Sequence, residues 1–149
     1  MKAYLTRRYH FSASHRLHAE SMSEEQNREV FGKCNNPFGH GHNYIVAVTF
    51  SGPIDPATGM VANLADLDGF AAEHLLSRFG YSNLNTLDLF ADRVPSTENL
   101  AVEVHRIFKS FPHATLEGVH VEETGNNSFE YAGPEPPIPV MNQKGIHAN

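Results

Sequence analysis

The chain has 149 residues with a formal net charge of −6, a single cysteine and ten histidines, and its length fits one domain that can bury a core. The acidic balance and the absence of a Lys/Arg run argue against a nucleic-acid partner, and no apolar stretch approaches the length of a membrane span. One cysteine cannot form an internal disulfide and the first residues do not resemble a signal peptide, so we expect a cytoplasmic protein without a membrane partner.

The first third of the chain predicts two strands separated by a loop. Residues 2–13 alternate loosely between apolar and polar side chains, which is typical of a half-buried strand, and this strand runs into His15. Residues 18–36 are rich in Ser, Glu, Asn and Gln and predict a loop with room for a short helical turn. The second strand covers residues 42–51, and the following Gly-Pro pair marks its end.

The apolar spacing then changes to a helical period. Residues 63–79 and 96–111 each carry apolar side chains that recur at three- and four-residue intervals, which predicts two amphipathic helices. Both segments begin with residues that commonly cap helices. The candidate caps are Asn63 or Asp66 for the first helix and Ser96 or Thr97 for the second.

Two further strands complete the predicted fold. They cover residues 115–123 and 128–132, with a Gly-Asn-Asn turn between them, and residues 133–149 form a Pro-rich extended tail. The order ββααββ predicts a single α+β domain over residues 1–149, with its core at about 3–132. We expect an antiparallel four-stranded sheet with two helices on one face. Because its edge strands lack partners, we expect a homo-oligomer.

Three histidines predict a metal site. His40 and His42 are two residues apart at the start of a strand, so period-two alternation points both imidazoles to one face. His15 ends the neighbouring strand and supplies a third imidazole; the alternative is a solvated loop histidine. Three imidazoles with an open fourth position are typical of catalytic zinc, which is the cofactor we expect. The other seven histidines lack this spacing and are treated as non-ligands.

Cys34 and Glu123 are candidates for the chemistry beside this metal. Cys34 precedes the His-Gly-His pair by six residues, and Lys33 together with a nearby cation would lower the pKa of its thiol; otherwise Cys34 is a small buried hydrophobe. Glu123 ends an apolar strand face, where its carboxylate needs a partner such as a planar ligand with two parallel N–H donors. The alternative is that the strand has ended and Glu123 is solvated.

These motifs together resemble the 6-pyruvoyl-tetrahydropterin synthase family, which includes the 6-carboxy-tetrahydropterin synthases of queuosine biosynthesis. The resemblance covers about residues 3–132. It is most specific in four segments, at residues 11–15, 32–44, 96–99 and 123–127. It implies the tunnelling fold, in which trimers close their sheets into a β-barrel and two trimers usually stack into a hexamer, with sites between subunits.

By position, the resemblance implies a role for each candidate residue. His15, His40 and His42 match the zinc ligands, and Cys34 matches the catalytic thiol. Glu123 matches the carboxylate that anchors the pterin ring. The motif beside that anchor matches Ser96, Thr97 and Glu98. The five residues between the cysteine and the His-Gly-His pair resemble the pyruvoyl-forming enzymes, because the queuosine enzymes typically have three.

One stretch departs from the family pattern. The family carries an Asp-His pair ahead of Asn-Leu that relays protons with the cysteine, and here Gly80 and Tyr81 occupy those positions. A thiol without an imidazole partner is a weaker base, and a phenol with a pKa near 10 accepts a proton poorly at neutral pH. His74 and Asp88 are the candidate substitutes.

The resemblance implies a zinc-dependent lyase that acts on a small-molecule dihydropterin, 7,8-dihydroneopterin triphosphate. Two alternatives stay open at this point. One is a diverged paralogue with 6-carboxy-tetrahydropterin synthase or dihydropterin aldolase-like activity. The other is a pterin-binding protein with little turnover. The Gly80-Tyr81 pair is the feature that separates both alternatives from the zinc-dependent lyase.

Overall fold

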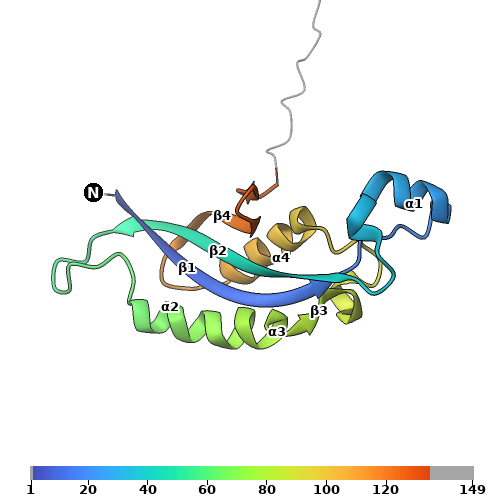
Figure 1. Ribbon diagram of the computed structural model, residues 1–149. Helices are drawn as coiled ribbons and strands as arrows, with labels where there is room; N and C mark the ends of the chain where they lie inside the picture. Colours follow the sequence, from blue (N-terminus) through green and yellow to red (C-terminus); the bar gives the residue numbers. More distant parts are fainter. Residues whose placement is uncertain (1, 135–149) are drawn as a thin grey trace, which may run out of the picture.

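The computed structural model describes residues 2–134 and has an α+β architecture (Figure 1). Most of the predicted tail therefore lies outside the described residues. Within these residues, none of the helices combines the length and the apolar character that a membrane span requires. The strands are β1 (Lys2–His15), β2 (His40–Pro53), β3 (Ser82–Asn83), β4 (Thr115–Thr124) and β5 (Asn127–Tyr131). The α-helices are α1 (Glu24–Phe31), α2 (Leu64–Ala71), α3 (Ser77–Phe79) and α4 (Thr97–Lys109). Short 3₁₀ helices cover Gly32–Asn35, Leu84–Thr86 and Asp88–Phe90, and a π-helix covers Ala72–Leu76.

The sheet has five strands in the order β3-β1-β2-β4-β5. Its four long strands pair antiparallel, and β1 and β2 pair over their full length. The prediction of four antiparallel strands was wrong in one respect, because β3 adds a fifth strand that runs parallel to β1 and makes the sheet mixed. β3 has only two residues, too few for an alternating pattern. It forms because the Tyr81 N–H donates to the Ser12 carbonyl at 2.6 Å and brings the chain alongside β1.

The helices α2, α3 and α4 cover one face of the sheet. Phe108 of α4 stacks on Tyr9 of β1, with ring centroids 6.0 Å apart, and also contacts Phe50 of β2 and Phe70 of α2. From the end of the first helical segment, Phe79 packs against β1. Since every second side chain of a strand points the same way, these contacts explain the buried alternation along β1 and β2. The apolar side chains that recur periodically along the sequence form the core of the fold.

The helix boundaries follow from local side-chain chemistry. Asn63 caps α2 by accepting from two backbone N–H groups, and Ser96 caps α4 by accepting from the Asn99 N–H. The segment over residues 18–36, predicted as a loop with room for a short helical turn, contains α1, whose eight residues are longer than the turn that was expected. Ser23 and Gln26 form a capping box at its start, which is the signal that identifies a helix there. Figure 1 shows α1 beyond the end of the sheet where β1 ends and β2 begins.

Candidate metal centre

The strand register brings the three predicted imidazoles together. His15 lies opposite His40 in the β1–β2 pair, and His42 lies opposite Ala13. Because side chains alternate, all three point to the face covered by the helices, at the end of the sheet. Gly39 makes this approach possible. It has φ +71°, and a Cβ at this position would lie 2.9 Å from the His15 carbonyl oxygen.

Four side chains offer ligand atoms that lie within 4.8 Å of one another. They are His15, His40, His42 and Glu123. The Nε2 atoms of His15 and His40 are 3.1 Å apart. One carboxylate oxygen of Glu123 lies 2.9 Å from His42 Nε2 and 3.6 Å from His15 Nε2. Glu123 therefore lies at the cluster, and the alternative that its side chain is fully solvated was wrong, since that side chain is only 11% exposed.

These atoms are arranged around a common point. His42 Nε2 is buried and close to the Glu123 carboxylate, but its direction does not meet the geometry of a hydrogen bond. Tetrahedral zinc with bonds of about 2.0–2.1 Å separates its ligand atoms by about 3.3 Å. The observed separations scatter around this value, and imidazole nitrogens with a carboxylate oxygen are a donor set that zinc accepts. The residues present therefore fit a divalent metal ion.

Hydrogen bonding and burial keep His15 ready for ligation. Its Nδ1 lies 2.8 Å from the Pro95 carbonyl oxygen, which can only accept, so the proton resides on Nδ1 and Nε2 is free. The hydroxyl of Tyr44 lies 3.5 Å from the same nitrogen. Burial is the main cause that lowers the pKa of His15 and of His42 below the ordinary 6.5. Both imidazoles are thus neutral at pH 7, as metal ligation requires.

Cys34 lies on the 3₁₀ helix Gly32–Asn35, beside the end of β1. The Cys34 carbonyl accepts from the Leu17 N–H at 2.8 Å, and the amide of the buried Asn35 donates to the Leu17 carbonyl at 2.8 Å. The predicted effect of Lys33 is not seen. Burial, and then the negative charge of Glu123, raise the pKa of the Cys34 thiol. The thiol is not among the four clustered ligand atoms, so it is available for another role.

The predicted motif at the start of α4 presents three different environments. Ser96 is occupied as the helix cap, with its Oγ accepting from the Asn99 N–H at 3.2 Å. Thr97 is 2% exposed, and its buried hydroxyl lies beside the Tyr44 hydroxyl but makes no well-aligned hydrogen bond in the described structure. Glu98 is exposed in the first turn of the helix. A buried hydroxyl without a well-aligned hydrogen bond is costly, which makes Thr97 the member of this motif best suited to receive a ligand.

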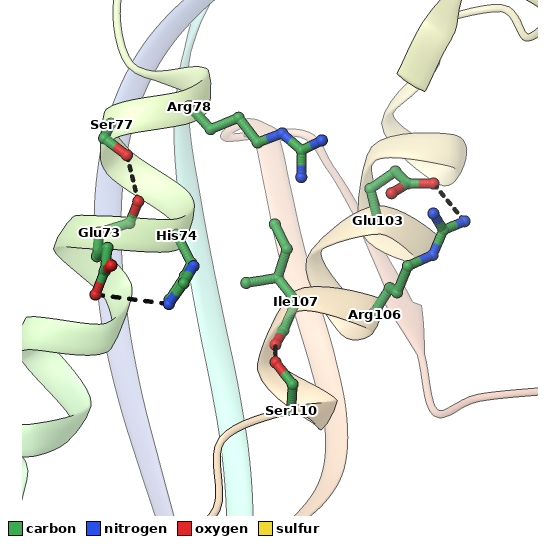
Figure 2. Close-up of a pocket in the computed structure, with 8 residues that line it drawn as sticks. All are labelled: Glu73, His74, Ser77, Arg78, Glu103, Arg106, Ile107 and Ser110. Atoms are coloured by element: carbon green, nitrogen blue, oxygen red, sulfur yellow. Dashed lines mark hydrogen bonds and ion pairs between the residues drawn. The ribbon is translucent and has the colours of Figure 1, made fainter. Parts of the chain in front are cut away.

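The candidate substitutes for the missing imidazole do not join the cluster. Figure 2 shows His74 in a groove between the π-helical segment and α4, on the far side of the helices from the sheet. Its Nε2 lies 3.7 Å from the Glu73 carboxylate, and its ring lies against Phe70. Asp88 is exposed on its own short 3₁₀ helix. Tyr81 has φ +56° and a side chain that is 97% exposed, and it lines a surface hollow together with His42.

Sequence reasoning missed the groups that hold the site in place. The Pro95 carbonyl orients His15, yet a backbone acceptor leaves no mark in a sequence. Asn35 and Asn127 anchor the segments of Cys34 and Glu123. In the sequence, each of these two residues is only an asparagine close to a candidate site residue. An asparagine identifies a side chain that can form hydrogen bonds, but it does not identify the group that it bonds to.

The chain is similar to known proteins over most of its length. Residues 4–134 match the family model described as 6-pyruvoyl tetrahydropterin synthase. A relative from Homo sapiens, 6-pyruvoyl tetrahydrobiopterin synthase, is 49% identical over 134 residues, which is 89% of this chain and 92% of that protein. The relative of the same name from Drosophila melanogaster is 45% identical, over 90% of this chain and 82% of that protein.

A solved structure supports the same relation. The structure of 6-pyruvoyl tetrahydropterin synthase from Caenorhabditis elegans superposes with a TM-score of 0.85 at 39% sequence identity, covering 90% of this chain and 97% of that one. An uncharacterised protein from Wolinella succinogenes has a TM-score of 0.68 at 15% identity, covering 90% of this chain and 99% of that one. The second likeness shows the fold alone.

Proposed function

Because the chain belongs to the 6-pyruvoyl tetrahydropterin synthase family, we propose that it is a zinc-dependent lyase that acts on 7,8-dihydroneopterin triphosphate. The observation that carries this proposal is the convergence of His15, His40 and His42 on one point beside Glu123. In this reaction, the triphosphate is eliminated and the side chain rearranges. A bound zinc ion would supply Lewis-acid chemistry at the side-chain hydroxyls of the substrate.

Each remaining site residue has a role in this proposal. Cys34 moves the proton at the side-chain carbon, and in the metal-free chain burial and the charge of Glu123 raise the pKa of its thiol. Glu123 accepts two parallel N–H groups from the pyrimidine edge of the pterin. Thr97 offers its buried hydroxyl to the bound ring, whereas Ser96 fixes the start of α4 and Glu98 lies at its surface.

The Gly80-Tyr81 pair sets the expected rate. Neither side chain is an imidazole, and the described structure supplies no other histidine to the cluster. General acid–base assistance contributes about 10²–10⁴-fold to typical rates. We therefore propose that the chain catalyses the elimination more slowly than family members that keep the Asp-His pair.

We also propose that the chain assembles into a trimer or hexamer whose sheets close into a barrel. The outer edge of β1 supports this, because β3 pairs only with Ala13 and Ser14 and leaves the rest of that edge without a strand partner in residues 2–134. β5 forms the opposite edge of the same sheet. Two open edges on one sheet favour pairing between copies.

The proposal is tested by incubating the purified protein with 7,8-dihydroneopterin triphosphate and identifying the products. We expect release of triphosphate and formation of the pyruvoyl product, loss of both after metal removal, and recovery on adding zinc. His42→Ala should lose zinc and activity together. Full activity of the metal-free protein, or zinc content unchanged by His42→Ala, would contradict the proposal.

A further inference from the structure

A groove between the helices lies apart from the metal centre. Its walls are the end of the first helical segment and one face of α4, and its volume is about 490 Å³. The residues that line it are Glu73, His74, Ser77, Arg78, Glu103, Arg106, Ile107 and Ser110. None of these residues supplies a ligand atom to the metal centre. Ligand pockets commonly have volumes of about 300–1,000 Å³, so this groove has room for a small molecule.

The backbone on both sides presents these side chains to the groove. On α4, the lining positions are spaced by three, four and seven residues from Glu103, which places them on one helix face. The opposite wall contains the π-helix Ala72–Leu76, in which the Ser77 N–H bonds to the Ala72 carbonyl five residues before it. Single π-helical turns are rare, and many of those known lie at functional sites. Arg78 follows this turn, and Figure 2 shows its side chain extending toward α4.

The carboxylate of Glu103 holds two arginines at one wall of the groove. Glu103 is 1% exposed, and its Oε1 accepts from Arg106 Nη2 at 2.8 Å and from Arg93 Nη2, which comes from outside the groove. One carboxylate offsets only one of two guanidinium charges, so this group keeps one positive charge in surplus. The Arg106 side chain is 67% exposed, and a guanidinium has five N–H donors. Arg106 therefore retains donors for a ligand while its position is fixed by Glu103.

Arg78 adds a second positive charge. Within residues 2–134, its guanidinium has no carboxylate at ion-pair distance. Among the lining residues, Glu73 is the only exposed acid, and one of its oxygens lies 3.7 Å from His74 Nε2. The groove thus concentrates positive charge on a chain whose formal net charge is −6. Because the hydroxyls of its two serines donate to backbone carbonyls, the arginines are its main free donors.

We propose that this groove binds a small molecule through a phosphate group held between Arg78 and Arg106. A phosphate monoester carries a charge of about −1.5 to −2 at pH 7, which matches the two surplus positive charges. The planar guanidinium fork fits phosphate oxygens, and hydrogen bonds between ionised groups are about twice as strong as neutral ones. The rest of the ligand lies along Ile107, the apolar residue of the lining. This inference is independent of the proposed function, because the groove and the metal centre share no residue.

Phenyl phosphate is a suitable probe, because it joins one phosphate group to an apolar ring. We would measure its affinity by titration calorimetry at constant pH and ionic strength for the wild type, Arg78→Gln and Glu73→Gln. Arg78→Gln removes a charged donor that has no acidic partner to leave unpaired, so we expect binding to weaken about tenfold with the fold intact. Glu73→Gln removes the exposed negative charge of the groove, so we expect binding to strengthen by about two- to fivefold.

Matched controls separate this groove from a general effect of charge. Arg28→Gln makes the same change of charge on the exposed surface of α1, so it should retain the wild-type affinity. Phenol, which lacks the phosphate, should not compete with phenyl phosphate. Binding at the metal centre would not respond to Arg78, so equal affinities of the wild type and Arg78→Gln would overturn this inference. It would also be overturned by equal losses in Arg78→Gln and Arg28→Gln, or by a wild type that does not bind the probe.

The zinc content of the same samples keeps the two proposals apart. We expect Arg78→Gln and Arg28→Gln to contain as much zinc as the wild type, because neither residue contributes to the metal centre. A wild type that binds phenyl phosphate in an Arg78-dependent way but lacks zinc would overturn the proposed function and support this inference. A zinc-containing wild type whose phenyl phosphate binding does not depend on Arg78 would overturn this inference alone.

Discussion

Replacing Gly39 by alanine tests whether this glycine sets the distance between His15 and His40, two of the proposed metal ligands. Its φ of +71° lies in the left-handed region, which costs an L-residue about 1–2 kcal/mol. The added Cβ would also lie 2.9 Å from the His15 carbonyl oxygen, and relief of such overpacking costs about 1–3 kcal/mol. Together these give a loss of about 2–5 kcal/mol in the free energy of unfolding of the metal-free protein.

The same substitution should weaken metal binding. The Nε2 atoms of His15 and His40 are 3.1 Å apart. Relief of the contact moves the start of β2, which carries His40, away from the end of β1, which carries His15. Metal–ligand distances tolerate only about 0.2 Å of change, so we expect the zinc affinity to fall tenfold or more, where each factor of ten is about 1.4 kcal/mol.

Gly41→Ala is the matched control, two residues further along the chain and inside β2. A Cβ there would lie 3.5 Å from the Ala13 carbonyl oxygen, an ordinary contact, and the backbone is not left-handed. Alanine in a strand is about 0.5–1 kcal/mol better than glycine, so this variant should be neutral or slightly more stable. Urea unfolding at one protein concentration and competition for zinc measure both quantities. Equal effects of Gly39→Ala and Gly41→Ala would refute the reasoning.

Four further predictions address the ring anchor, the relay, the assembly and a buried histidine. Glu123→Gln removes charge-assisted hydrogen bonds worth about 1.5–3 kcal/mol, so pterin affinity measured by fluorescence titration should fall tenfold or more. Tyr81→His should raise turnover on dihydroneopterin triphosphate by less than the about 10²–10⁴-fold of full acid–base assistance, and Gly80→Asp should add little except instability, because its Cβ would lie 2.6 Å from a backbone oxygen. Light scattering at micromolar concentration should give a trimer or hexamer, and a stable monomer would exclude the barrel. Burial lowers the pKa of His105 below 6.5, so the unfolded state binds more protons than the folded state. The stability that His105 contributes above pH 6.5 is therefore lost as the pH falls through the lowered pKa. Urea unfolding at pH 7 and pH 5 should show a smaller loss of stability in His105→Gln than in the wild type.

The parts of the fold that sequence predicted are those with long, regular periods. The apolar alternation along β1 and β2 and the helical spacing over residues 63–79 and 96–111 identified the elements that form the core. The short elements were missed for a physical reason. β3 is only two residues long and depends on a hydrogen bond from Tyr81 to Ser12, a contact between segments far apart in the chain.

The sequence predicted which imidazoles lie together at the end of the sheet, but not the groups that orient them. His15, His40 and His42 meet because strand alternation and antiparallel pairing are simple geometric rules. The sequence does not show which glycine matters: Gly41 lies between the two histidines, but Gly39 makes the tight contact. That difference depends on where β1 ends relative to the start of β2, which pattern alone does not give.

The Gly80-Tyr81 departure is built into the backbone and is more than an exchange of two side chains. The Gly80 N–H bonds to the Leu76 carbonyl at the end of α3, and a Cβ at Gly80 would lie 2.6 Å from that same oxygen. The next residue, Tyr81, takes a left-handed φ of +56° and starts the turn into β3 through its bond to Ser12. An aspartate at position 80 would therefore have to rebuild the end of the helix before it could support an imidazole at position 81. A change at position 80 therefore affects the end of the helix as well as the side chain. A faster enzyme would be reached first by replacing Tyr81 alone, because its exposed side chain can change without disturbing the core.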